Sequence, residues 1–415
     1  MENKADVIVI GAGIVGLSTA YYLALSGKSV IVLEKTDGAD SCSVGNAGYI
    51  APSHIIPLSS PGIVAKGLRW MLNPESPFYI KPRLNLSLAK WGINFMRSAT
   101  QAHVNNSKKL LADICLLSQE LHHEFADQHG IKVQKRGVMM HCLTESALQH
   151  EKELAKMTND LGIKATVHEI EELDAIDPKV RHKGLGAVYF PDDSFMDPKD
   201  FIVGMKKALD GLNVTIRYNQ EVTGFETTGN QIKLIRTTSE EYVGDEIILA
   251  TGAFTPPIAR LLGKRVLIEA GKGYSVDYHE ESLVPEISYI LVEARVAITP
   301  LDKFTRVAGT MEIAGLDQSV NKRRVAGYLK SVENYLPDFK YEKMKDLPVW
   351  AGLRPCSPDG LPYIGRDNKY DNLIVAAGHA MIGFTLGPAT GKLVSELVNG
   401  QPTTLNIAQL AVNRF

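Results

Sequence analysis

Three glycines near the start of the chain have the spacing of a nucleotide-binding turn. They stand between the strand-like run 6–10 (DVIVI) and the largely apolar, helix-like run 14–26. In such a turn the first glycine permits the tight bend, the second lets the backbone approach a pyrophosphate, and the third lets the helix pack on the strand. The positive N-terminus of the helix then attracts phosphate. We therefore assign five residues to phosphate binding: Gly11, Gly13, Ile14, Val15 and Gly16.

An acidic residue follows where a ribose would need it. A second strand-like run, 29–33, ends just before Glu34. A carboxylate about 20 residues beyond the glycine turn accepts hydrogen bonds from ribose hydroxyls. With 35 glycines in 415 residues, isolated triplets of this spacing arise by chance. The order strand, turn, helix, strand is the context that a true site requires, so we assign Glu34 and Lys35 to the ribose end of a Rossmann-type site.

The composition narrows the class of protein. The chain has 45% hydrophobic and 22% charged residues and a net charge of -2, which is ordinary for one large globular domain or two interleaved ones. That charge provides no general field for nucleic acid, so we expect no nucleic-acid partner. The cysteines, at 42, 115, 142 and 356, lack CxxC spacing. We therefore expect no disulfides, no metal site and a cytoplasmic location. No run reaches the roughly 18 apolar residues of a membrane span.

Periodicity and turn residues predict the remaining elements. Helices are expected over 108–129, 147–161, 197–209, 319–335 and 386–399, and strands over 214–217, 221–227, 231–237, 246–250 and 372–378, with further strands between 266 and 313. The run 246–250 is largely apolar, as in a buried parallel strand. Thr251 and Gly252 at its end would allow close approach of a cofactor.

One stretch, 62–100, is crowded with large apolar residues and broken by prolines at 74, 77 and 82. It includes Trp70, Phe78, Trp91 and Met96. Two interpretations are open. The stretch is buried within a substrate domain, or it forms a surface that docks on a membrane or on a partner.

Further motifs follow in an order that resembles one family. They are ATG at 250–252, GLRP at 352–355, SPDG at 357–360 and GH at 378–379, with GNAG at 45–48 and SPG at 60–62. Together with the glycine turn and Glu34, they resemble the D-amino acid oxidase family of flavoproteins over essentially the whole chain. Within that family the pattern is most similar to the bacterial D-amino acid dehydrogenases, relatives of the glycine and sarcosine oxidases.

The resemblance implies a fold and a cofactor. It predicts an α/β plus α+β architecture, with a Rossmann-type FAD-binding domain (1–60, 190–255 and 345–415) and an interleaved substrate-binding domain (61–189 and 256–344) on a mainly antiparallel sheet. Because one fingerprint is present, no second domain for a nicotinamide is expected, and an NAD-linked dehydrogenase is the weaker alternative. The electrons would pass to a quinone or another external carrier. The inner face of a membrane is then a possible place of action.

The resemblance also implies contacts with FAD. Val222 should meet the adenine end through its backbone, with core packing as the alternative. The other implied contacts are Ser43, Gly45, Asn46, Ala47, Gly48, Thr251, Gly252, Gly352, Gly378, Met381, Ile382, Gly383, Phe384 and Thr385. N–H groups near Leu386 and Gly387, where the last helix is expected to begin, would stabilise charge on the reduced ring. Some relatives attach FAD to a cysteine, but the matching position is Gly352 rather than Cys356, so we expect non-covalent FAD.

Arg354 in the GLRP motif is the residue that the resemblance assigns to substrate. A guanidinium fork binds a carboxylate through two parallel hydrogen bonds, and a surface salt bridge is the alternative role. Tyr274, His379 and His54 are weaker candidates for contacts with substrate, each with a structural role as its alternative. Arg295 and Arg306 could also contact the carboxylate or the tail of the substrate, but we expect both to form ion pairs at the surface.

The implied reaction is the oxidative deamination of D-amino acids. The Cα hydrogen would leave as hydride to the flavin N5, and water would hydrolyse the imine to a 2-oxo acid and ammonia. Orientation supplies most of the catalysis, and no dedicated acid or base is needed if the amine arrives neutral. Two alternatives stay open. One is the oxidation of a secondary or cyclic amine such as D-proline, D-hydroxyproline or sarcosine, and the other is flavin binding without turnover.

Overall fold

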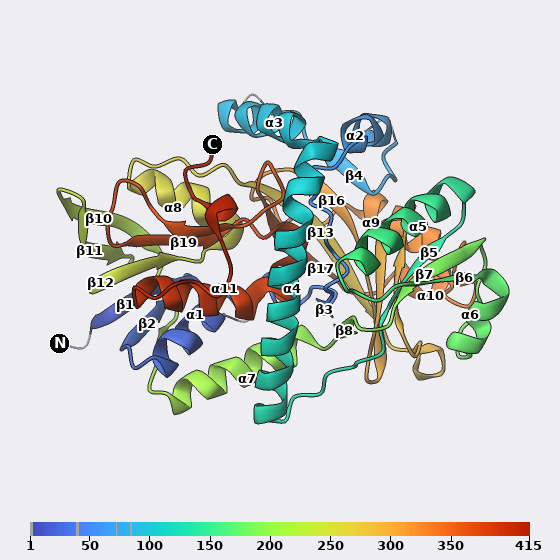
Figure 1. Ribbon diagram of the computed structural model, residues 1–415, viewed down its shortest axis with the longest axis horizontal. Coiled ribbons are helices and arrows are strands. Elements are labelled where there is room, and N and C mark those ends of the chain that lie inside the picture. The colour runs from blue at the N-terminus through green and yellow to red at the C-terminus, as the bar shows by residue number, and fades with distance from the viewer. Residues whose placement is uncertain (1–2, 39–40, 72, 84) are drawn as a thin grey trace.

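Two β-sheets lie side by side in the computed structural model, and the long helix α4 (Gln101–His129) runs between them (Figure 1). The structure describes residues 3–38, 41–71, 73–83 and 85–415. The first sheet carries the N-terminal glycine turn. The second is built mainly from the middle of the chain. Both chain ends lie on the side of the first sheet (Figure 1).

The first sheet has the strand order β10-β11-β12-β1-β2-β9. In addition, β19 pairs with β12, and β18 pairs with β19. Its strands are β1 (Lys4–Ile10), β2 (Val30–Leu33), β9 (Thr215–Arg217), β10 (Val222–Thr228), β11 (Gln231–Thr237), β12 (Glu241–Leu249), β18 (Tyr363–Arg366) and β19 (Leu373–Ala377). Strand β1 pairs in parallel with both β2 and β12. The predicted Rossmann-type order of strand, turn, helix and strand is confirmed.

Side chains alternate across this sheet, because successive residues of a strand point to opposite faces. Val7 and Val9 belong to the core formed with α1 (Ile14–Leu25), α7 (Pro198–Gly211) and α11 (Gly383–Val398). Ile8 and Ile10 belong to the core formed with α8 (Thr255–Leu261) and the β10–β11 hairpin. The sheet is therefore covered on both faces, as parallel strands require.

The second sheet has the order β17-β13-β16-β15-β14-β5-β7-β6, with β4 beside β16. Its strands are β4 (Phe78–Ile80), β5 (Val138–Cys142), β6 (Thr166–Glu169), β7 (Gly186–Phe190), β13 (Glu269–Tyr278), β14 (Ser288–Leu291), β15 (Val296–Leu301), β16 (Phe304–Ile313) and β17 (Val349–Cys356). Two of its pairings, β14 with β5 and β4 with β16, are parallel, and β13, β15, β16 and β17 pair antiparallel. The predicted mainly antiparallel sheet is confirmed.

The remaining elements connect or cover the sheets. They are α2 (Ile63–Met71), α3 (Leu86–Ser98), α5 (Glu145–Asp160), α6 (Ile170–Ile176), α9 (Lys322–Val332), α10 (Tyr341–Met344), the small ladder β3 (Tyr49–Ile50) with β8 (Ser194–Phe195), and 3-10 turns at Gly252–Phe254, Glu281–Leu283, Ala380–Ile382 and Ala408–Leu410. Helices α2 and α3 stand out from the body at the top of Figure 1. They belong to the apolar stretch 62–100.

The structure corrects three details of the sequence prediction. Strand β17 pairs with β13 of the second sheet, although the expected boundary at 345 placed it in the first domain. Helix α4 packs in the core of the first sheet through Leu110, Leu111 and Ile114, although 61–189 was expected to be one substrate domain. Helix α11 begins at Gly383, one turn earlier than 386. Apolar periodicity shows which face of an element is buried, but not which sheet buries it.

Candidate functional site

A cavity of about 450 Å³ runs between the two sheets, from the glycine turn to β17. It lies beyond the carboxyl ends of the parallel strands, where ligands bind in open α/β sheets. The sequence-predicted residues that line it are Gly11, Gly13, Ile14, Val15, Glu34, Lys35, Ser43, Asn46, Val222, Thr251, Gly252, Arg354, His379, Met381, Gly383 and Phe384. Residues separated by more than 300 positions thus meet in one space.

The phosphate end of the cavity is the turn before α1. Gly11 has φ +107°, and a Cβ on it would lie 2.7 Å from the carbonyl oxygen of Ala250. A Cβ on Gly16 would overlap the carbonyl oxygen of Gly11. The first turn of α1 contains no acidic residue, and Gly13 provides no side-chain cap. The positive field of the helix N-terminus is therefore available to a pyrophosphate.

Glu34 braces the same turn. Its Oε2 accepts a hydrogen bond from Ala12 N–H at 3.0 Å, and its Oε1 accepts from the N–H and Oγ1 of Thr36 at 3.1 and 3.0 Å. A carboxylate has about four lone-pair sites, so one remains for a ribose hydroxyl. Beside it the Lys35 ammonium lies 3.3 Å from the centroid of the Phe254 ring, and both residues line the cavity.

Arg306 clamps the loop that follows Ser43. Its guanidinium is paired with Asp277 through Nε and Nη2 at 2.8 and 2.9 Å, and its Nη1 donates to the carbonyl oxygens of Val44 and Asn46 at 3.2 and 3.1 Å. Arg306 is not among the residues that line the cavity. Arg306 is therefore paired, as expected, but it is buried rather than exposed, because its donors are committed to Asp277 and to this loop.

Two side-chain hydroxyl groups of the second sheet donate hydrogen bonds to other backbone carbonyls of the same loop. Ser275 Oγ donates to the carbonyl oxygen of Gly45 at 2.9 Å, and Thr299 Oγ1 donates to that of Ala47 at 2.7 Å. The carbonyls of residues 44–47 thus all bond to the second sheet. The N–H groups of residues 45–47 donate to no other described residue, and these donors suit the oxygen and nitrogen atoms of a bound ring.

The same loop contacts the first sheet through Ser43. The Oγ of Ser43 accepts from the N–H of Ile14 at 3.0 Å, at the first position of α1. The loop 43–47 is therefore bonded on one side to the phosphate-binding helix and on the other side to strands β13, β15 and β16.

Arg354 lies at the opposite end of the cavity, on the edge strand β17. Its Nη1 donates to the carbonyl oxygen of Thr310 at 2.8 Å, and its guanidinium fills the space above Gly273, where a Cβ would overlap it. Among the described residues no carboxylate forms an ion pair with Arg354. Burial lowers the pKa of Arg354, yet a guanidinium stays protonated. A desolvated cation facing a cavity without a counter-ion is a binding site for an anion such as a carboxylate.

His379 lines the cavity as a neutral imidazole. Its Nε2 lies 3.0 Å from Thr390 Oγ1, which itself donates to the carbonyl oxygen of Leu386 at 2.8 Å. The imidazole must then be the donor, so the proton is assigned to Nε2 from this network. Burial lowers the pKa of His379 to about 3. His379 is therefore uncharged at neutral pH and does not act as a proton acceptor there.

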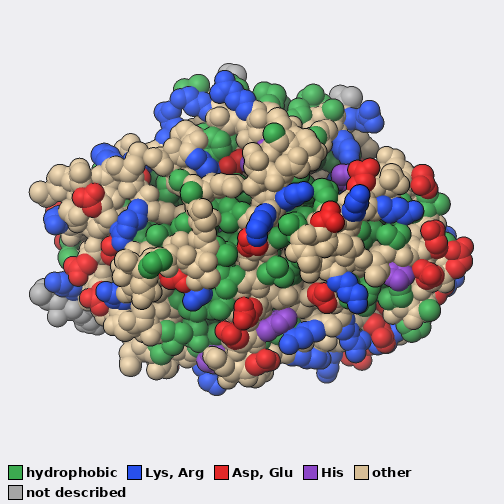
Figure 2. Space-filling model, viewed as in Figure 1, with side chains coloured by type: hydrophobic (Ala, Val, Ile, Leu, Met, Phe, Trp, Pro, Cys, Tyr) green, Lys and Arg blue, Asp and Glu red, His purple; other side chains and the backbone are tan. Residues whose placement is uncertain are grey.

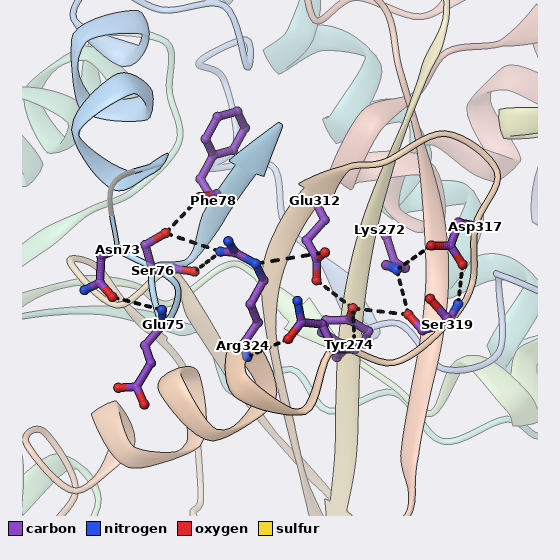
Figure 3. Close-up of polar contacts among 11 residues, drawn as sticks. Asn73, Glu75, Ser76, Phe78, Lys272, Tyr274, Glu312, Asp317, Ser319 and Arg324 are labelled. Atoms are coloured by element: carbon purple, nitrogen blue, oxygen red, sulfur yellow. Dashed lines mark hydrogen bonds and ion pairs between the residues drawn. The ribbon is translucent and has the colours of Figure 1, made fainter. Parts of the chain in front are cut away.

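Tyr274 and His54 lie outside the cavity, which contradicts their assignment as contacts with substrate. Figure 3 shows the Tyr274 hydroxyl directed at Glu312, to which it donates at 2.6 Å, and it also accepts from the N–H of Asn321 at 3.0 Å. Tyr274 belongs to the core under α9. His54 Nδ1 faces Ser53 Oγ at 3.3 Å. Neither residue is part of the lining, so each has the structural role that was its alternative.

Several predicted cofactor residues support the cavity without lining it. They are Gly16, Gly45, Ala47, Gly48, Gly352, Gly378, Ile382 and Thr385. Trp350, which the sequence did not single out, explains two of them. Its indole occupies the space above Gly45 and above Gly352, so a Cβ at either position would overlap it. Thr385 Oγ1 donates to the carbonyl oxygen of Tyr49 at 2.8 Å and so fixes the start of α11.

The sequence analysis did not assign several other residues that line the cavity. They include Cys42, Phe254, Gln318, Leu353, Pro355 and Ala377. Leu353 and Pro355 flank Arg354 and could have been found from the GLRP motif. Cys42 and Gln318 come from loops that reach the cavity only through tertiary packing. Because α11 begins at Gly383, the N–H groups free for a ligand are those of 383–385 rather than those of Leu386 and Gly387.

Comparison with known proteins gives one consistent result. Residues 6–397 match a family described as DAO, FAD dependent oxidoreductase. A D-amino acid dehydrogenase from Helicobacter pylori is 33% identical over 95% of each chain. Among solved structures, a glycine oxidase from Geobacillus kaustophilus superposes with a TM-score of 0.79 at 20% identity, covering 100% of this chain and 99% of the other. An L-proline dehydrogenase from P. horikoshii superposes with a TM-score of 0.75 at 20% identity, covering 100% and 98%.

The residues that line the cavity and its loop fit FAD in the donors that they offer. The glycine turn and the α1 N-terminus would hold the pyrophosphate, Glu34 the ribose, and the free N–H groups of residues 45–47 the flavin ring. The thiols do not favour a covalent link. Cys42 lines the cavity, but burial raises its pKa. Cys356 does not line it, and burial raises its pKa to about 12. A thiol that is not ionised is a poor nucleophile.

We expect FAD to be released when the protein is unfolded. Precipitation of the holoenzyme with acid should leave all yellow colour in the supernatant, because no thiolate is available to bond the flavin. The measurement is the flavin absorbance of the supernatant and of the washed pellet. Colour retained by the pellet would contradict non-covalent binding, and its loss in Cys42→Ser but not in Cys356→Ser would identify the attached residue.

Proposed function

Because the chain belongs to the DAO family of FAD-dependent oxidoreductases, we propose that it is a D-amino acid dehydrogenase. The enzyme class and the cofactor follow from the family match over 6–397. The substrate class is the proposed part. The observation that carries it is Arg354, a cation with no carboxylate partner among the described residues, at the end of the FAD cavity.

Arg354 would fix the substrate by its carboxylate. One nitrogen of the fork, Nη1, is held by the carbonyl oxygen of Thr310, which sets the plane of the guanidinium. Thr310 has φ +70°, a conformation that the register shift between β13 and β16 imposes. The remaining N–H groups can bind a carboxylate in the bidentate geometry that Arg favours. With the carboxylate fixed, the position of Cα is set to within a small volume.

Positioning is the main contribution of the protein to the reaction. Bound FAD supplies the acceptor for the hydride that leaves Cα. Holding Cα in a near-attack geometry can contribute roughly 7–11 kcal/mol. His379 is neutral and bonded to Thr390, so the substrate amine must arrive without its extra proton. Flavin binding without turnover would have been favoured by an Arg354 salt bridge, and among the described residues Arg354 has none.

Removal of the Arg354 side chain tests the substrate assignment. We expect Arg354→Ala to lower kcat/KM for D-amino acids. The loss of transition-state stabilisation should be about 2–5 kcal/mol, the usual cost of truncating one partner of a buried charge pair. FAD content should be unchanged. Steady-state kinetics and the flavin spectrum measure the two effects. Arg236→Ala, which changes an exposed arginine of β11, is the matched control. Near-normal KM in Arg354→Ala would contradict the assignment.

The pH dependence tests whether the enzyme supplies a base. His379 has a pKa of about 3, so it does not titrate between pH 5 and 8. We expect kcat/KM to rise with pH in step with deprotonation of the substrate amine. The apparent pKa should therefore shift between substrates with different amine pKa values and stay constant in His379→Asn. One apparent pKa near neutrality, shared by all substrates, would show a base on the enzyme instead.

We further propose that the electrons pass to a quinone at a membrane surface that α3 contacts. In α3 the side chains of Leu86, Ile93 and Met96 are 69%, 46% and 55% exposed. Ile93 follows Leu86 by seven positions and Met96 follows Ile93 by three, so the three side chains share one helix face. Lys90 and Arg97 flank them. Figure 2 shows cationic and apolar side chains gathered at the top of the molecule, over the helices that Figure 1 places there.

Hydrogen bonds attach the stretch 62–100, which carries this surface, to the rest of the protein. Arg324 Nη1 donates to the carbonyl oxygen of Ser76 at 3.0 Å (Figure 3), and Trp91 Nε1 donates to that of Cys356 at 2.8 Å. Trp91 is buried while Leu86 is exposed, so the stretch 62–100 is part core and part surface. No helix of the described residues is long and apolar enough to cross a bilayer. Contact with lipid would therefore be peripheral.

Flotation on vesicles tests the membrane surface. We expect the protein to float with vesicles that contain phosphatidylglycerol, because apolar burial and cationic attraction act together. The triple variant Leu86→Ser, Ile93→Ser, Met96→Ser should stay at the bottom of the gradient. Leu261→Ser, at an exposed leucine of α8, is the matched control. Equal flotation of the triple variant and the control would contradict a role for α3.

A further inference from the structure

A second cavity, of about 660 Å³, adjoins the FAD cavity. Ala253 and Pro257 line both cavities, so the wall between them is thin. Its other walls come from the first turns of α3, from α8, and from the segments 263–270 and 315–316. Nothing in the proposed substrate site uses this space.

The rim of the second cavity is cationic. Arg83 pairs with Glu269 at 3.0 Å and Lys264 with Asp367 at 3.0 Å, so these charges balance. Within the described part of the chain Arg260 and Arg265 form no ion pair, and both are exposed. The Nε of Arg83 is buried and has no hydrogen-bond acceptor among the residues that the structure describes. The rim therefore offers donors that match carbonyl or anionic oxygens.

The floor of the cavity is apolar. It is formed by Trp91, Val266, Ile268 and Ala270, all buried. The indole of Trp91 is fixed by its hydrogen bond to Cys356, two residues beyond Arg354 on β17. A flat apolar ring with oxygen substituents fits this combination better than a small hydrated anion, which would gain nothing from the floor.

We propose that the second cavity binds the quinone that reoxidises the enzyme. This inference rests on the proposed function. Three features point to the same occupant: the apolar floor with donors at the rim, the thin wall shared with the FAD cavity, and α3. Ser87 lines the cavity, and Leu86 beside it is the most exposed apolar residue of the α3 surface. A lipid-soluble molecule can thus move from a membrane along α3 to the mouth of the cavity.

The transfer balances without another reactant. The quinone accepts two electrons and two protons from reduced FAD, and quinol and oxidised FAD are formed. The quinone needs no direct access to the substrate space, since the two cavities are separate. Amino acid and quinone can therefore occupy the protein at the same time.

Two filling variants test this site. Ser87→Trp and Leu316→Trp place an indole into the cavity from two different segments of its lining. Val203→Trp puts the same side chain on an exposed position of α7 that lines neither cavity, and is the control. Each holoenzyme is titrated anaerobically with dithionite just to full reduction of the flavin, so that no dithionite remains, and is then mixed with ubiquinone-1 while the return of the oxidised flavin absorbance is followed. Because dithionite replaces the amino acid, the test does not depend on the substrate assignment.

We expect the wild-type rate to saturate with ubiquinone-1. Both filling variants should lower the rate at low quinone about tenfold or more, equivalent to about 1.4 kcal/mol of lost binding, and Val203→Trp should not. Reoxidation by phenazine methosulfate, which reacts directly at flavin, should be normal in all variants. Equilibrium dialysis of ubiquinone-1 against the oxidised proteins should show weaker binding by both filling variants than by the wild type and the control.

Three results would overturn the proposal. They are equal ubiquinone-1 rates in the filling variants and the control, a wild-type rate that never saturates, and equal losses with ubiquinone-1 and phenazine methosulfate. If one filling variant fails to fold, the other carries the test from a different segment of the lining. Displacement of ubiquinone-1 by inorganic phosphate at low concentration would show instead that the rim selects anions.

Discussion

The hydrogen bonds that hold the loop 43–47 are the constraint on which the site depends. Ser43 accepts from the first N–H of α1, and the next four carbonyls accept from Arg306, Ser275 and Thr299 of the second sheet. Arg306 is nearly buried and is itself oriented by Asp277. A short loop thus joins the glycine turn of one sheet to three strands of the other, and the N–H groups of residues 45–47 donate to no other described residue.

The two ends of the reaction site come from different sheets. The first sheet provides the glycine turn and Glu34, to which we assign the nucleotide. The second provides β17, whose Arg354 is the proposed anchor for a carboxylate. Catalysis by positioning requires that these two ends keep a fixed separation, since a displacement of about 1 Å can cost about a hundredfold in rate. The loop 43–47, together with Trp350 packed on Gly45 and Gly352, supplies that rigidity.

The parts of the site that could be predicted are those set by local geometry. The glycine turn requires particular residues within a few positions of one another, and Glu34 follows at the end of the next strand, so both are readable from spacing. Arg354 was predicted from its motif and lies in the cavity. Tyr274 and His54 were misassigned because the face on which a residue of a strand or loop points depends on what packs there. Tyr274 points under α9 and bonds to Glu312.

Contacts between residues far apart in the chain also could not be predicted from the sequence. The assignment of β17 to the second sheet rests on its pairing with β13, almost 80 residues earlier in the chain. The role of Arg306 rests on carbonyls about 260 residues away. No local pattern marks either contact, because backbone carbonyls are present at every residue and any strand edge can pair. The second cavity is likewise formed by segments that have no common motif.

The most direct measurement is anaerobic bleaching of the flavin by a panel of amino acids. Purified holoenzyme is mixed with individual D- and L-amino acids, with D- and L-proline, D-hydroxyproline and sarcosine, and the loss of oxidised flavin absorbance is recorded. We expect primary D-amino acids to reduce the flavin fastest, and their 2-oxo acids to form in equal amount. Reduction by prolines or sarcosine alone would assign the enzyme to secondary amines, and reduction by L-amino acids alone would contradict the proposed function.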